Sequence, residues 1–419
     1  MKVTIVAIGT RGDTQPFIAL GHRLVSRGHD VRLVCAGNFT ALAEEAGLEA
    51  VPLSYDPNEI LGSPRGQRVL SSGRNLLKLA WHSVRLAKPY LERDTVVLAE
   101  ACTGADAVIY STIGFSAHHV AERDGTWNCH AQVQPIEPTR DFPPMQVPFG
   151  LGPLGNRIAH EAAEQIMWHA FRAFINEWRT REAGLPAAPF FGPYRALRRA
   201  RTPVLCGFSD AMIPRGRDWG DNVKVTGFWF YDPPSTWTPP QDLVDFIGDG
   251  PAPVYAGFGS MVPGDLADTD RLLRAALRKS GQRGVLLGNP QGLPNDDQFF
   301  TVTDVPHTWL IPQMAAAVHH GGIGTTSGCL RAGVPNVVAA FFHDQPYFGQ
   351  RVHELGAGPK PLWYQKLTVP DLAERITQAV TSPRMKERAM EIGARIHAED
   401  GAGTAADHVE SWVANHQRG

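Results

Sequence analysis

The chain lacks a strong excess of either charge, and no run of apolar residues in it approaches the ~20 needed to cross a bilayer. Its 419 residues carry 40 Lys and Arg against 42 Asp and Glu, a formal net charge of −2. This balance gives no electrostatic reason to expect a nucleic-acid partner. We therefore expect neither nucleic-acid binding nor a transmembrane segment.

Cysteine is also scarce. The five cysteines are widely spaced and form no CxxC pair, so neither a zinc site nor a disulfide framework is indicated. The amino-terminal sequence MKVTIVAIG has too short an apolar core for a signal peptide. Both observations favour a cytoplasmic protein. Glycine and proline are plentiful, at 42 and 33 residues, which is typical of a chain with many strand-to-helix turns.

Short apolar runs alternate with helical patterns along most of the chain. In the first half this predicts helices at 16–28 and 40–46, and strands at 3–8, 30–36, 48–53, 107–111, 127–133, 204–207 and 223–226. In the second half it predicts helices at 271–279 and 325–332, and strands at 254–258, 284–288, 315–319 and 337–342. Such alternation indicates an α/β fold with parallel sheets covered by helices on both faces.

The segment 231–240, YDPPSTWTPP, contains four prolines and is the best domain boundary. We therefore expect an N-terminal domain at 1–230, the linker at 231–240 and a C-terminal domain at 241–385. Helices at 386–419 would follow, with an apolar stripe that needs a surface on which to dock: Ala406, Val409, Trp412 and Val413. Ligands of such sheets bind at the carboxyl ends of the strands, so the two domains are expected to face across a cleft.

A glycine-rich turn at 318–326, VHHGGIGTT, lies between a predicted strand and a predicted helix. Glycines allow close approach of a ligand to the backbone, and the helix start offers N–H groups and a partial positive charge. This favours a diphosphate site over a purely structural turn with capping threonines. A nicotinamide cofactor is the alternative, because Gly322, Gly324 and Gly328 spell GxGxxxG and Asp344 follows about 20 residues later. The adjacent histidines would crowd that fingerprint.

The next strand-to-helix loop carries Asp344 and Gln345 within the sequence FHDQP. Their acceptor oxygens and amide donor suit the hydroxyls of a sugar. The alternative is that Asp344 only caps the following helix.

Several motifs resemble those of one enzyme superfamily. HHGGIGTT, RAGVP and DQP resemble the C-terminal signature of nucleotide-sugar-dependent glycosyltransferases with the GT-B fold. GTRGDTQPFIALGHRL resembles the N-terminal signature of the sterol glucosyltransferases and of the bacterial glycopeptide and macrolide glycosyltransferases, a branch that serves antibiotic biosynthesis. PVYAGFGSM and NVKVTGFWF resemble the sterol-type branch. The resemblance implies two Rossmann-like doubly wound domains, with the acceptor held by the first and the nucleotide sugar by the second.

The resemblance also implies roles for individual residues. The diphosphate would be held by Ser260, His320, Gly322, Gly324 and Thr325, and the sugar by Asp344 and Gln345. The nucleobase would meet the backbone of Val305 and the ring of Trp309, although Trp309 could equally pack the sheet edge. UDP is the expected nucleotide, with TDP as the alternative. No cofactor is implied.

Asp13 is the expected catalytic base, because it lies in the first strand-to-helix loop, where relatives carry a His or an Asp. Its alternative role is to cap a helix that begins near Pro16. Attack opposite the leaving group implies inversion. No metal ion is expected: Asp268-Thr269-Asp270 spells DxD but suits a helix start, and the His118-His119 pair suits a helix packing face.

The acceptor walls are expected at 62–92 and 135–155, with Phe142, Met145 and Phe149 in the second. These suit a bulky apolar acceptor such as a sterol or a polyketide, and the alternative is a loop packed on its own domain. Four arginines at 195, 198, 199 and 201 indicate a solvated face, with peripheral contact to an anionic membrane as the other interpretation.

Together these features predict an inverting, metal-independent glycosyltransferase that moves glucose from UDP-glucose to a hydrophobic alcohol or phenol. The alternatives are a sugar-nucleotide epimerase of the same fold and a nicotinamide-dependent oxidoreductase.

Overall fold

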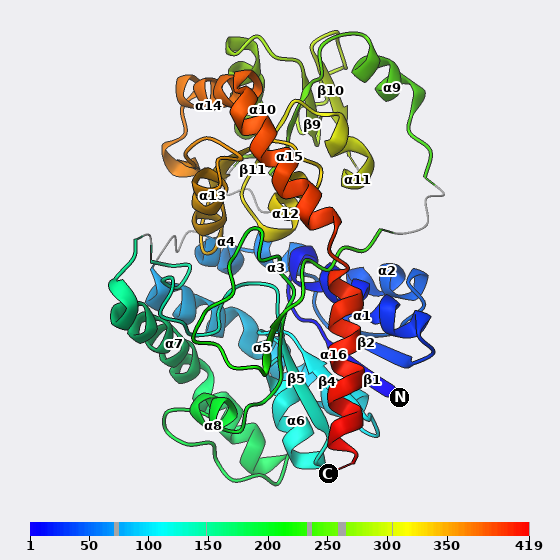
Figure 1. Cartoon of the computed structure of the whole chain (residues 1–419), viewed down its shortest axis with the longest axis vertical. Helices are drawn as coiled ribbons and strands as arrows, with labels where there is room; N and C mark the ends of the chain where they lie inside the picture. Colours follow the sequence, from blue (N-terminus) through cyan, green and yellow to red (C-terminus); the bar gives the residue numbers. More distant parts are fainter. Residues whose placement is uncertain (71–74, 148, 233–236, 259–264, 304, 419) are drawn as a thin grey trace. The chain divides into compact units, whose positions relative to one another are not determined.

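The computed structural model describes residues 1–70, 75–147, 149–232, 237–258, 265–303 and 305–418. The chain divides into two compact units (Figure 1). Unit 1 comprises Met1–Pro233 together with Glu399–Gly419, and unit 2 comprises Pro234–Ala398. Each unit folds around its own parallel sheet.

The sheet of unit 1 has the strand order β3-β2-β1-β4-β5-β6-β7, and all of its paired strands in the described residues run parallel. The first strand, β1 (Lys2–Val6), lies between β2 (Asp30–Ala36) and β4 (Ala107–Tyr110). The remaining strands are β3 (Glu49–Leu53), β5 (Trp127–Gln132), β6 (Val204–Cys206) and β7 (Val223–Val225). The strand order reverses between β1 and β4, so the carboxyl ends of these two strands form the switch point where such sheets bind ligands.

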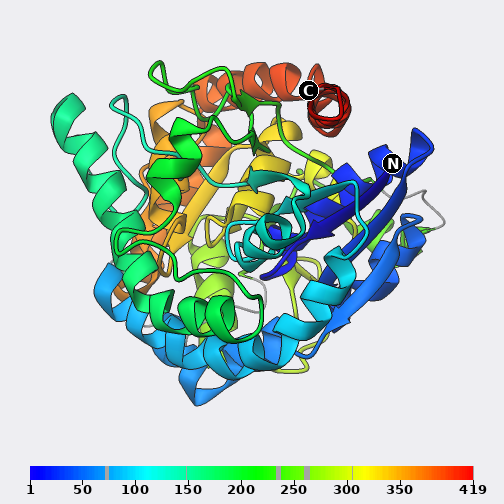
Figure 2. The same cartoon turned by 90° about the horizontal axis from the view of Figure 1, so that it is seen from below.

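The helices of unit 1 cover both faces of this sheet. They are α1 (Arg11–Ser26), α2 (Thr40–Glu45), α3 (Pro57–Gly62), α4 (Pro64–Leu70), α5 (Leu76–Cys102), α6 (Ser116–Asp124), α7 (Gly152–Arg181), α8 (Tyr194–Arg199) and α16 (Gly401–His416). The long helix α5 packs against both α4 and α7 (Figure 2).

The last helix, α16, packs against α1 in unit 1 (Figure 1). Its buried residues Val409 and Val413 belong to the same apolar cluster as Phe17 of α1. Glu410 adds polar contacts, 2.9 Å from Arg27 and 2.7 Å from His29. The C-terminal apolar stripe thus has its docking surface on the first helix of the chain.

Unit 2 has the corresponding strand order, β10-β9-β8-β11-β12-β13, with parallel pairing throughout the described residues. Its strands are β8 (Val254–Ala256), β9 (Gly284–Leu287), β10 (Phe299–Val302), β11 (Ala316–His319), β12 (Asn336–Ala340) and β13 (Leu362–Trp363). Its helices are α9 (Gln241–Gly248), α10 (Leu266–Lys279), α11 (His307–Leu310), α12 (Ile323–Arg331), α13 (Gln345–Glu354), α14 (Val369–Thr381) and α15 (Pro383–His397). Here the switch point lies between β8 and β11.

The predicted α/β class with two doubly wound sheets is confirmed, and several details differ. Helix α1 begins at Arg11 rather than near Pro16, so this proline lies inside the helix. The short edge strands β10 and β13 were not predicted. Helix α15 packs on α12 within unit 2, so of the segment 386–419 only the residues from Glu399 onward join unit 1.

No helix in the described ranges combines the length and the hydropathy that a bilayer span requires.

Candidate active site

The turn after β11 is anchored by the first of its two histidines. His319 is fully buried, its Nε2 lies 2.8 Å from Oδ1 of Asn336, and its Nδ1 accepts the backbone N–H of Gly321 at 3.0 Å. These contacts require the neutral tautomer with the proton on Nε2. Burial lowers the pKa of His319 to about 3, so the ring is neutral near pH 7. His319 therefore fixes the turn and is not available to a ligand.

The turn itself needs glycine at position 321. Gly321 has a φ of +92°, in the region that side chains disfavour. A Cβ atom there would lie 2.6 Å from Cγ1 of Val338 and 3.0 Å from the carbonyl oxygen of Gln345. The loops after β11 and β12 are thus in direct contact.

His320, unlike His319, remains a candidate ligand group. Its ring stacks on Phe341, with centroids 6.1 Å apart and planes at 7°. Its Nδ1 is buried without a hydrogen-bond partner among the described residues. Burial lowers the pKa of His320 to about 4, although Asp344 and a hydrogen bond with the backbone of Phe258 act in the opposite direction. The ring is therefore neutral near pH 7 in the absence of a ligand.

Helix α12 presents its amino-terminal end beside His320. Gly322 is the N-cap residue and supplies no side-chain cap, so the first N–H groups keep their capacity to bind an anion. The hydroxyl of Thr326 bonds back to the carbonyl of Gly322 at 2.9 Å, and that of Ser327 to Gly324 at 3.0 Å. The half-buried Thr325 has no partner for its hydroxyl in the described part of the chain, which leaves it free to meet a ligand.

The loop after β12 presents Asp344. This residue is the N-cap of α13, but its side chain makes no capping hydrogen bond, so capping does not account for the carboxylate. Its Oδ1 lies 3.5 Å from Nδ1 of His343, which has the strained φ of +55°. Non-glycine residues in this conformation are uncommon and cluster at functional sites.

Gln345 is placed differently from the expectation. Its side chain is 1% exposed, and its Oε1 accepts the backbone N–H groups of Phe341 at 2.8 Å and Phe342 at 3.3 Å. The amide oxygen therefore closes the loop and is not free for a sugar hydroxyl. Only the amide nitrogen could reach a ligand.

The expected nucleobase contacts are only partly described. Val305 is half-buried at the start of the loop before α11. Trp309 of α11 packs edge-on against Trp237, with ring centroids 5.2 Å apart at 61°. Trp309 also packs against the apolar cluster that includes Phe300 of the edge strand β10, in keeping with the packing alternative. Ser260 lies outside the described residues.

In unit 1, Asp13 lies within the first turn of α1 and takes part in its capping. The N-cap residue is Thr10, whose backbone N–H and hydroxyl each donate to Oδ2 of Asp13 at 3.0 Å. Oδ1 accepts a hydrogen bond from Nε2 of Gln134 at 3.2 Å. The carboxylate is thus oriented from two sides at the carboxyl edge of β1, and Gln134 is a site residue that the sequence did not reveal.

The backbone just before Asp13 is equally constrained. Gly9 has a φ of +143°, and a Cβ atom there would lie 2.5 Å from Oδ2 of Asp13. Its N–H donates to the hydroxyl of Tyr55 at 3.1 Å. The ring of Tyr55 in turn packs edge-on against Tyr90 of α5, at 6.0 Å. The loop after β1 is therefore tied to the segment that follows β3.

The three expected acceptor contacts have different surroundings. Phe149 is 63% exposed, while Met145 is only 5% exposed and belongs to the protein interior. Phe142 is half-buried, with its ring edge-on to Trp219 at 6.0 Å. Of the three, Phe149 is the one that can meet a ligand without rearrangement.

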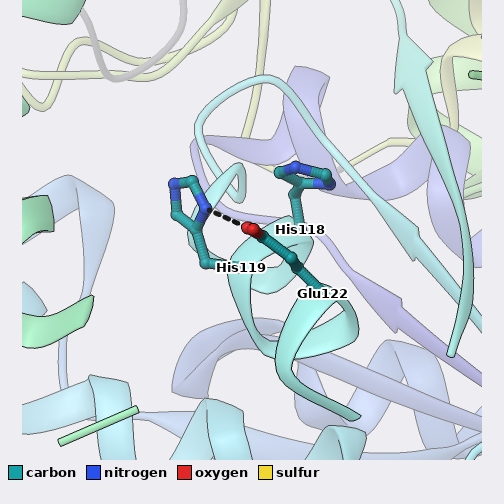
Figure 3. A group of neighbouring side chains, drawn as sticks. All are labelled: His118, His119 and Glu122. Atoms are coloured by element: carbon teal, nitrogen blue, oxygen red, sulfur yellow. Dashed lines mark ion pairs between the residues drawn. The ribbon is translucent and has the colours of Figure 1, made fainter. Parts of the chain in front are cut away.

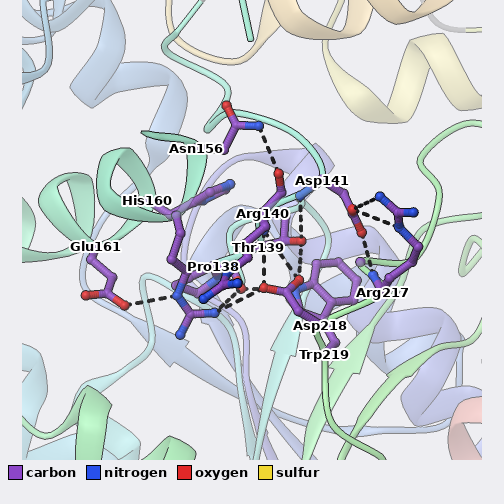
Figure 4. Close-up of polar contacts among 12 residues, drawn as sticks. Pro138, Thr139, Arg140, Asp141, Asn156, His160, Glu161, Arg217, Asp218 and Trp219 are labelled. Atoms are coloured by element: carbon purple, nitrogen blue, oxygen red, sulfur yellow. Dashed lines mark hydrogen bonds and ion pairs between the residues drawn. The ribbon is translucent and has the colours of Figure 1, made fainter. Parts of the chain in front are cut away.

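The start of this loop is held firmly (Figure 4). Asp218 accepts from the hydroxyl of Thr139 at 2.5 Å and from the backbone of Arg140 at 3.2 Å. Asp141 pairs with Arg217 at 2.6 Å. Residues 138–141 thus pack on their own unit, which matches the alternative considered for this loop.

Two clusters that resemble metal sites are occupied by arginine. His118, His119 and Glu122 lie together on α6 (Figure 3), but Arg179 lies 2.5 Å from the carboxylate and 2.8 Å from Nδ1 of His119. The guanidinium already supplies the positive charge there, so the cluster does not fit a cation.

The DxD motif is structural. Asp270 is buried in an ion pair with Arg274 at 2.9 Å, and exposed Asp268 pairs with Arg271. The cap of α10 is Asp265, which accepts from the N–H of Ala267 at 2.8 Å. The DxD acids therefore have partners, and the cap lies three residues before the first of them.

Two family models match the chain. The glycosyltransferase family 28 N-terminal domain matches residues 3–140, and the erythromycin biosynthesis protein CIII-like C-terminal domain matches residues 291–409. The first match covers β1 and the loop of Asp13. The second covers the turn of His320 and the loop of Asp344.

Characterised relatives extend over nearly the whole chain. The O-mycaminosyltylonolide 6-deoxyallosyltransferase of Streptomyces fradiae is 34% identical, over 99% of this chain and 98% of its own. The sterol 3-beta-glucosyltransferase UGT80B1 of Arabidopsis thaliana is 33% identical over 97% of this chain and 67% of its own length. The sterol 3-beta-glucosyltransferase of Emericella nidulans is 32% identical over 98% of this chain, and the matched region spans only 30% of the fungal protein.

Solved structures share the fold. The calicheamicin glycosyltransferase CalG4 superposes with a TM-score of 0.71 at 17% identity, covering 99% of this chain and 98% of its own. The glycosyltransferase VinC in complex with dTDP gives a TM-score of 0.67 at 18% identity, with 100% of both chains covered. The chain therefore belongs to the GT-B nucleotide-sugar-dependent glycosyltransferases, in the branch of the sterol glucosyltransferases and the antibiotic glycosyltransferases.

Proposed function

We propose that the chain is an inverting, metal-independent glycosyltransferase that moves glucose from UDP-glucose onto a hydroxyl of a hydrophobic acceptor. The acceptor class is a sterol, a macrolide or another polyketide. The observation that carries this proposal is the likeness, over almost the whole chain, to a sterol glucosyltransferase and to a Streptomyces deoxyallosyltransferase. The epimerase and oxidoreductase alternatives gain no support from these relatives.

In this proposal the donor diphosphate binds at the start of α12. The N–H groups of the turn at Gly322 and Gly324, the hydroxyl of Thr325 and the ring of His320 meet its oxygens. Ser260, which the resemblance implies, is the remaining proposed contact. The negative charge of the diphosphate is balanced by the helix dipole and these hydrogen bonds, without a metal cation.

The sugar and the base are held by the neighbouring loops. Asp344 accepts hydrogen bonds from the sugar hydroxyls. Gln345 contributes only its amide nitrogen, because its amide oxygen already accepts the N–H of Phe341. The backbone of Val305 and the ring of Trp309 meet the nucleobase. A deoxysugar on TDP is the second donor candidate, supported by the dTDP complex of a structural neighbour.

Asp13 is the proposed base. As the acceptor oxygen attacks the anomeric carbon, its proton passes to the carboxylate, and the bond to the diphosphate oxygen breaks with its electron pair leaving on the nucleotide. Attack from the opposite face turns an α-linked donor into a β-glycoside. Phe149 is the most exposed of the apolar candidates for the acceptor, Phe142 is half-buried and Met145 is buried.

Mass spectrometry of a donor-by-acceptor panel tests this function. UDP-glucose, UDP-galactose and TDP-deoxysugars are each incubated with sterol, macrolide and flavonoid acceptors. A product heavier by one hexose, formed from UDP-glucose, supports the proposal. Hydrolysis or epimerisation of the donor without any acceptor product would overturn it.

Calorimetry of UDP binding tests the donor site separately. His320→Ala and Thr325→Ala are each expected to weaken UDP binding, while Ser327→Ala, whose hydroxyl bonds back to Gly324, serves as the matched control. Unchanged UDP affinity in both site variants would show that the diphosphate binds elsewhere.

A further inference from the structure

One tyrosine outside the expected site residues contacts the loop that carries Asp13. Tyr55 lies two residues after the end of β3, and its hydroxyl accepts the backbone N–H of Gly9 at 3.1 Å. Because β2 lies between β3 and β1 in the sheet, this contact spans the carboxyl end of one strand. Tyr55 is half-buried there. It is therefore a polar partner of the loop after β1 and not only a packing residue.

The backbone of Gly9 lies close against the carboxyl group of Asp13. A Cβ atom on Gly9 would lie 2.5 Å from Oδ2 of Asp13 and 2.7 Å from its Cγ. Oδ2 is also the oxygen that accepts the N–H and the hydroxyl of Thr10. Since closely packed atoms leave little free space, a shift of Gly9 is expected to displace the carboxylate. The position of Gly9 thus limits the positions open to Asp13.

Helix α5 in turn anchors the segment of Tyr55. The N–H of Ser54 donates to both oxygens of the buried Asp94, at 3.1 and 3.2 Å, and Arg93 donates to the carbonyl oxygen of Ser54 at 3.2 Å. The ring of Tyr55 packs edge-on against Tyr90, with centroids 6.0 Å apart. The backbone before Tyr55 and its ring are thus both held by one helix, which gives the hydroxyl a defined position.

The hydroxyl of Tyr55 acts as a neutral group. Burial raises the pKa of Tyr55, against the opposing effect of its hydrogen bond with Gly9, so the hydroxyl stays protonated near pH 7. A neutral oxygen can accept the N–H of Gly9 without placing a second negative charge beside the carboxylate of Asp13. Phenylalanine at this position would keep the ring and lose only the hydrogen bond.

We propose that Tyr55 is a positioning residue for the transfer: it holds Gly9 and thereby keeps the carboxylate of Asp13 in place. The inference rests on the proposed function, in which Asp13 is the base. In this role Tyr55 acts only through Asp13. Part of α5 belongs to the segment 62–92 that is expected to line the acceptor site, so the same contacts connect the acceptor wall to the base.

Hydrogen exchange tests the contact itself. The N–H of Gly9 loses its acceptor in the Y55F variant, so it should exchange with solvent at least about tenfold faster than in the wild type. Y231F is the matched control in the same unit, because the buried hydroxyl of Tyr231 has no hydrogen-bond partner among the described residues. Unchanged exchange at Gly9 in Y55F would show that Tyr55 does not hold this backbone, and would overturn the proposal whatever the kinetics.

A double-mutant cycle tests the role in catalysis. Y55F is made both in the wild type and in the D13N variant, and Y231F is made in the wild type. The kcat and the KM for the donor are measured with the donor and acceptor that give product. Circular dichroism verifies that every form folds.

In the wild-type background, Y55F is expected to lower kcat by about three- to tenfold, the effect of one lost hydrogen bond, while the KM for the donor stays constant. In the D13N background it should change kcat by less than about twofold, because the base through which it acts is gone. Full kcat in Y55F, the same loss in both backgrounds, or an equal loss in Y231F would overturn the positioning role and leave the proposed function standing. No product from the wild type would overturn the proposed function, and with it the role of Tyr55.

Discussion

Gln134 donates a hydrogen bond from Nε2 to Oδ1 of Asp13 at 3.2 Å, although 121 residues separate them in the sequence. Thr10 holds the other carboxylate oxygen with its N–H and its hydroxyl. The candidate base is therefore oriented by the end of β1 and by the segment that follows β5. This arrangement lets capping and catalysis be separated by mutation.

Asp13→Asn isolates the proton-accepting role. The asparagine oxygen can still accept the N–H of Thr10, which remains the N-cap, so α1 should form normally. Without a base, kcat is expected to fall by about 10²–10⁴-fold. Product formation by mass spectrometry measures this, with UDP affinity by calorimetry as the control. Full turnover with unchanged affinity would remove Asp13 from the mechanism.

Gln134→Leu tests whether the orientation of Asp13 matters. A hydrogen bond to a charged group contributes about 1.5–3 kcal/mol, so kcat is expected to fall by roughly tenfold or more while the KM for the donor stays constant. Gln15→Leu is the matched control, because Gln15 accepts from Arg11 on the exposed side of the same helix. Full kcat in Gln134→Leu, or an equal loss in the control, would contradict a positioning role.

Gly321→Ala should damage the donor turn. The alanine would need a φ of +92° and would place Cβ 2.6 Å from Val338, so the free energy of unfolding should fall by about 1–3 kcal/mol and UDP binding should weaken. Gly328→Ala is the control within α12, because a Cβ there meets nothing within 4 Å. It should raise the free energy of unfolding by about 0.5–1 kcal/mol. Urea unfolding measures both, and equal stability of the two variants would refute the constraint.

Stability should fall as the pH drops from about 6.5 to about 4. Burial lowers the pKa of His160 to about 4, against the opposing effect of its contact with Phe142, and burial likewise lowers those of His118 and His320 to about 4. In that window the unfolded chain takes up protons that the folded chain excludes, so each such group contributes up to about 1.4 kcal/mol per pH unit.

His160→Gln measures one share of this effect. Glutamine does not titrate and can still donate to the carbonyl of Phe142, which His160 meets at 3.1 Å. The free energy of unfolding of the His160→Gln variant should fall less steeply than that of the wild type as the pH drops from 6 to 5. Identical slopes in the two proteins would show that His160 is not neutral in the folded state.

The sheets could be predicted because parallel strands buried on both faces form short apolar runs between turn residues. The strand predicted at 30–36 is observed as Asp30–Ala36, with its last four residues buried. The start of α1 was misplaced because Pro16 was taken as its first turn. The pairing of Thr10 with Asp13 sets the earlier start, and the helix tolerates the proline inside it.

The division of roles within the site could not be predicted, because it depends on contacts between distant segments. His319 and His320 are adjacent, yet only His319 meets Asn336, on the next strand. The sequence gives no sign that the amide oxygen of Gln345 is engaged. In the structure it accepts the N–H groups of Phe341 and Phe342. The partner of Asp13, Gln134, likewise comes from another loop.

The central claim is that the turn after β11 holds the diphosphate of the donor. A crystal structure with UDP bound tests this most directly. The account predicts the two phosphates within hydrogen-bonding distance of the N–H groups at the start of α12, the hydroxyl of Thr325 and the ring of His320. A nucleotide seated elsewhere, with this turn unchanged and empty, would contradict it.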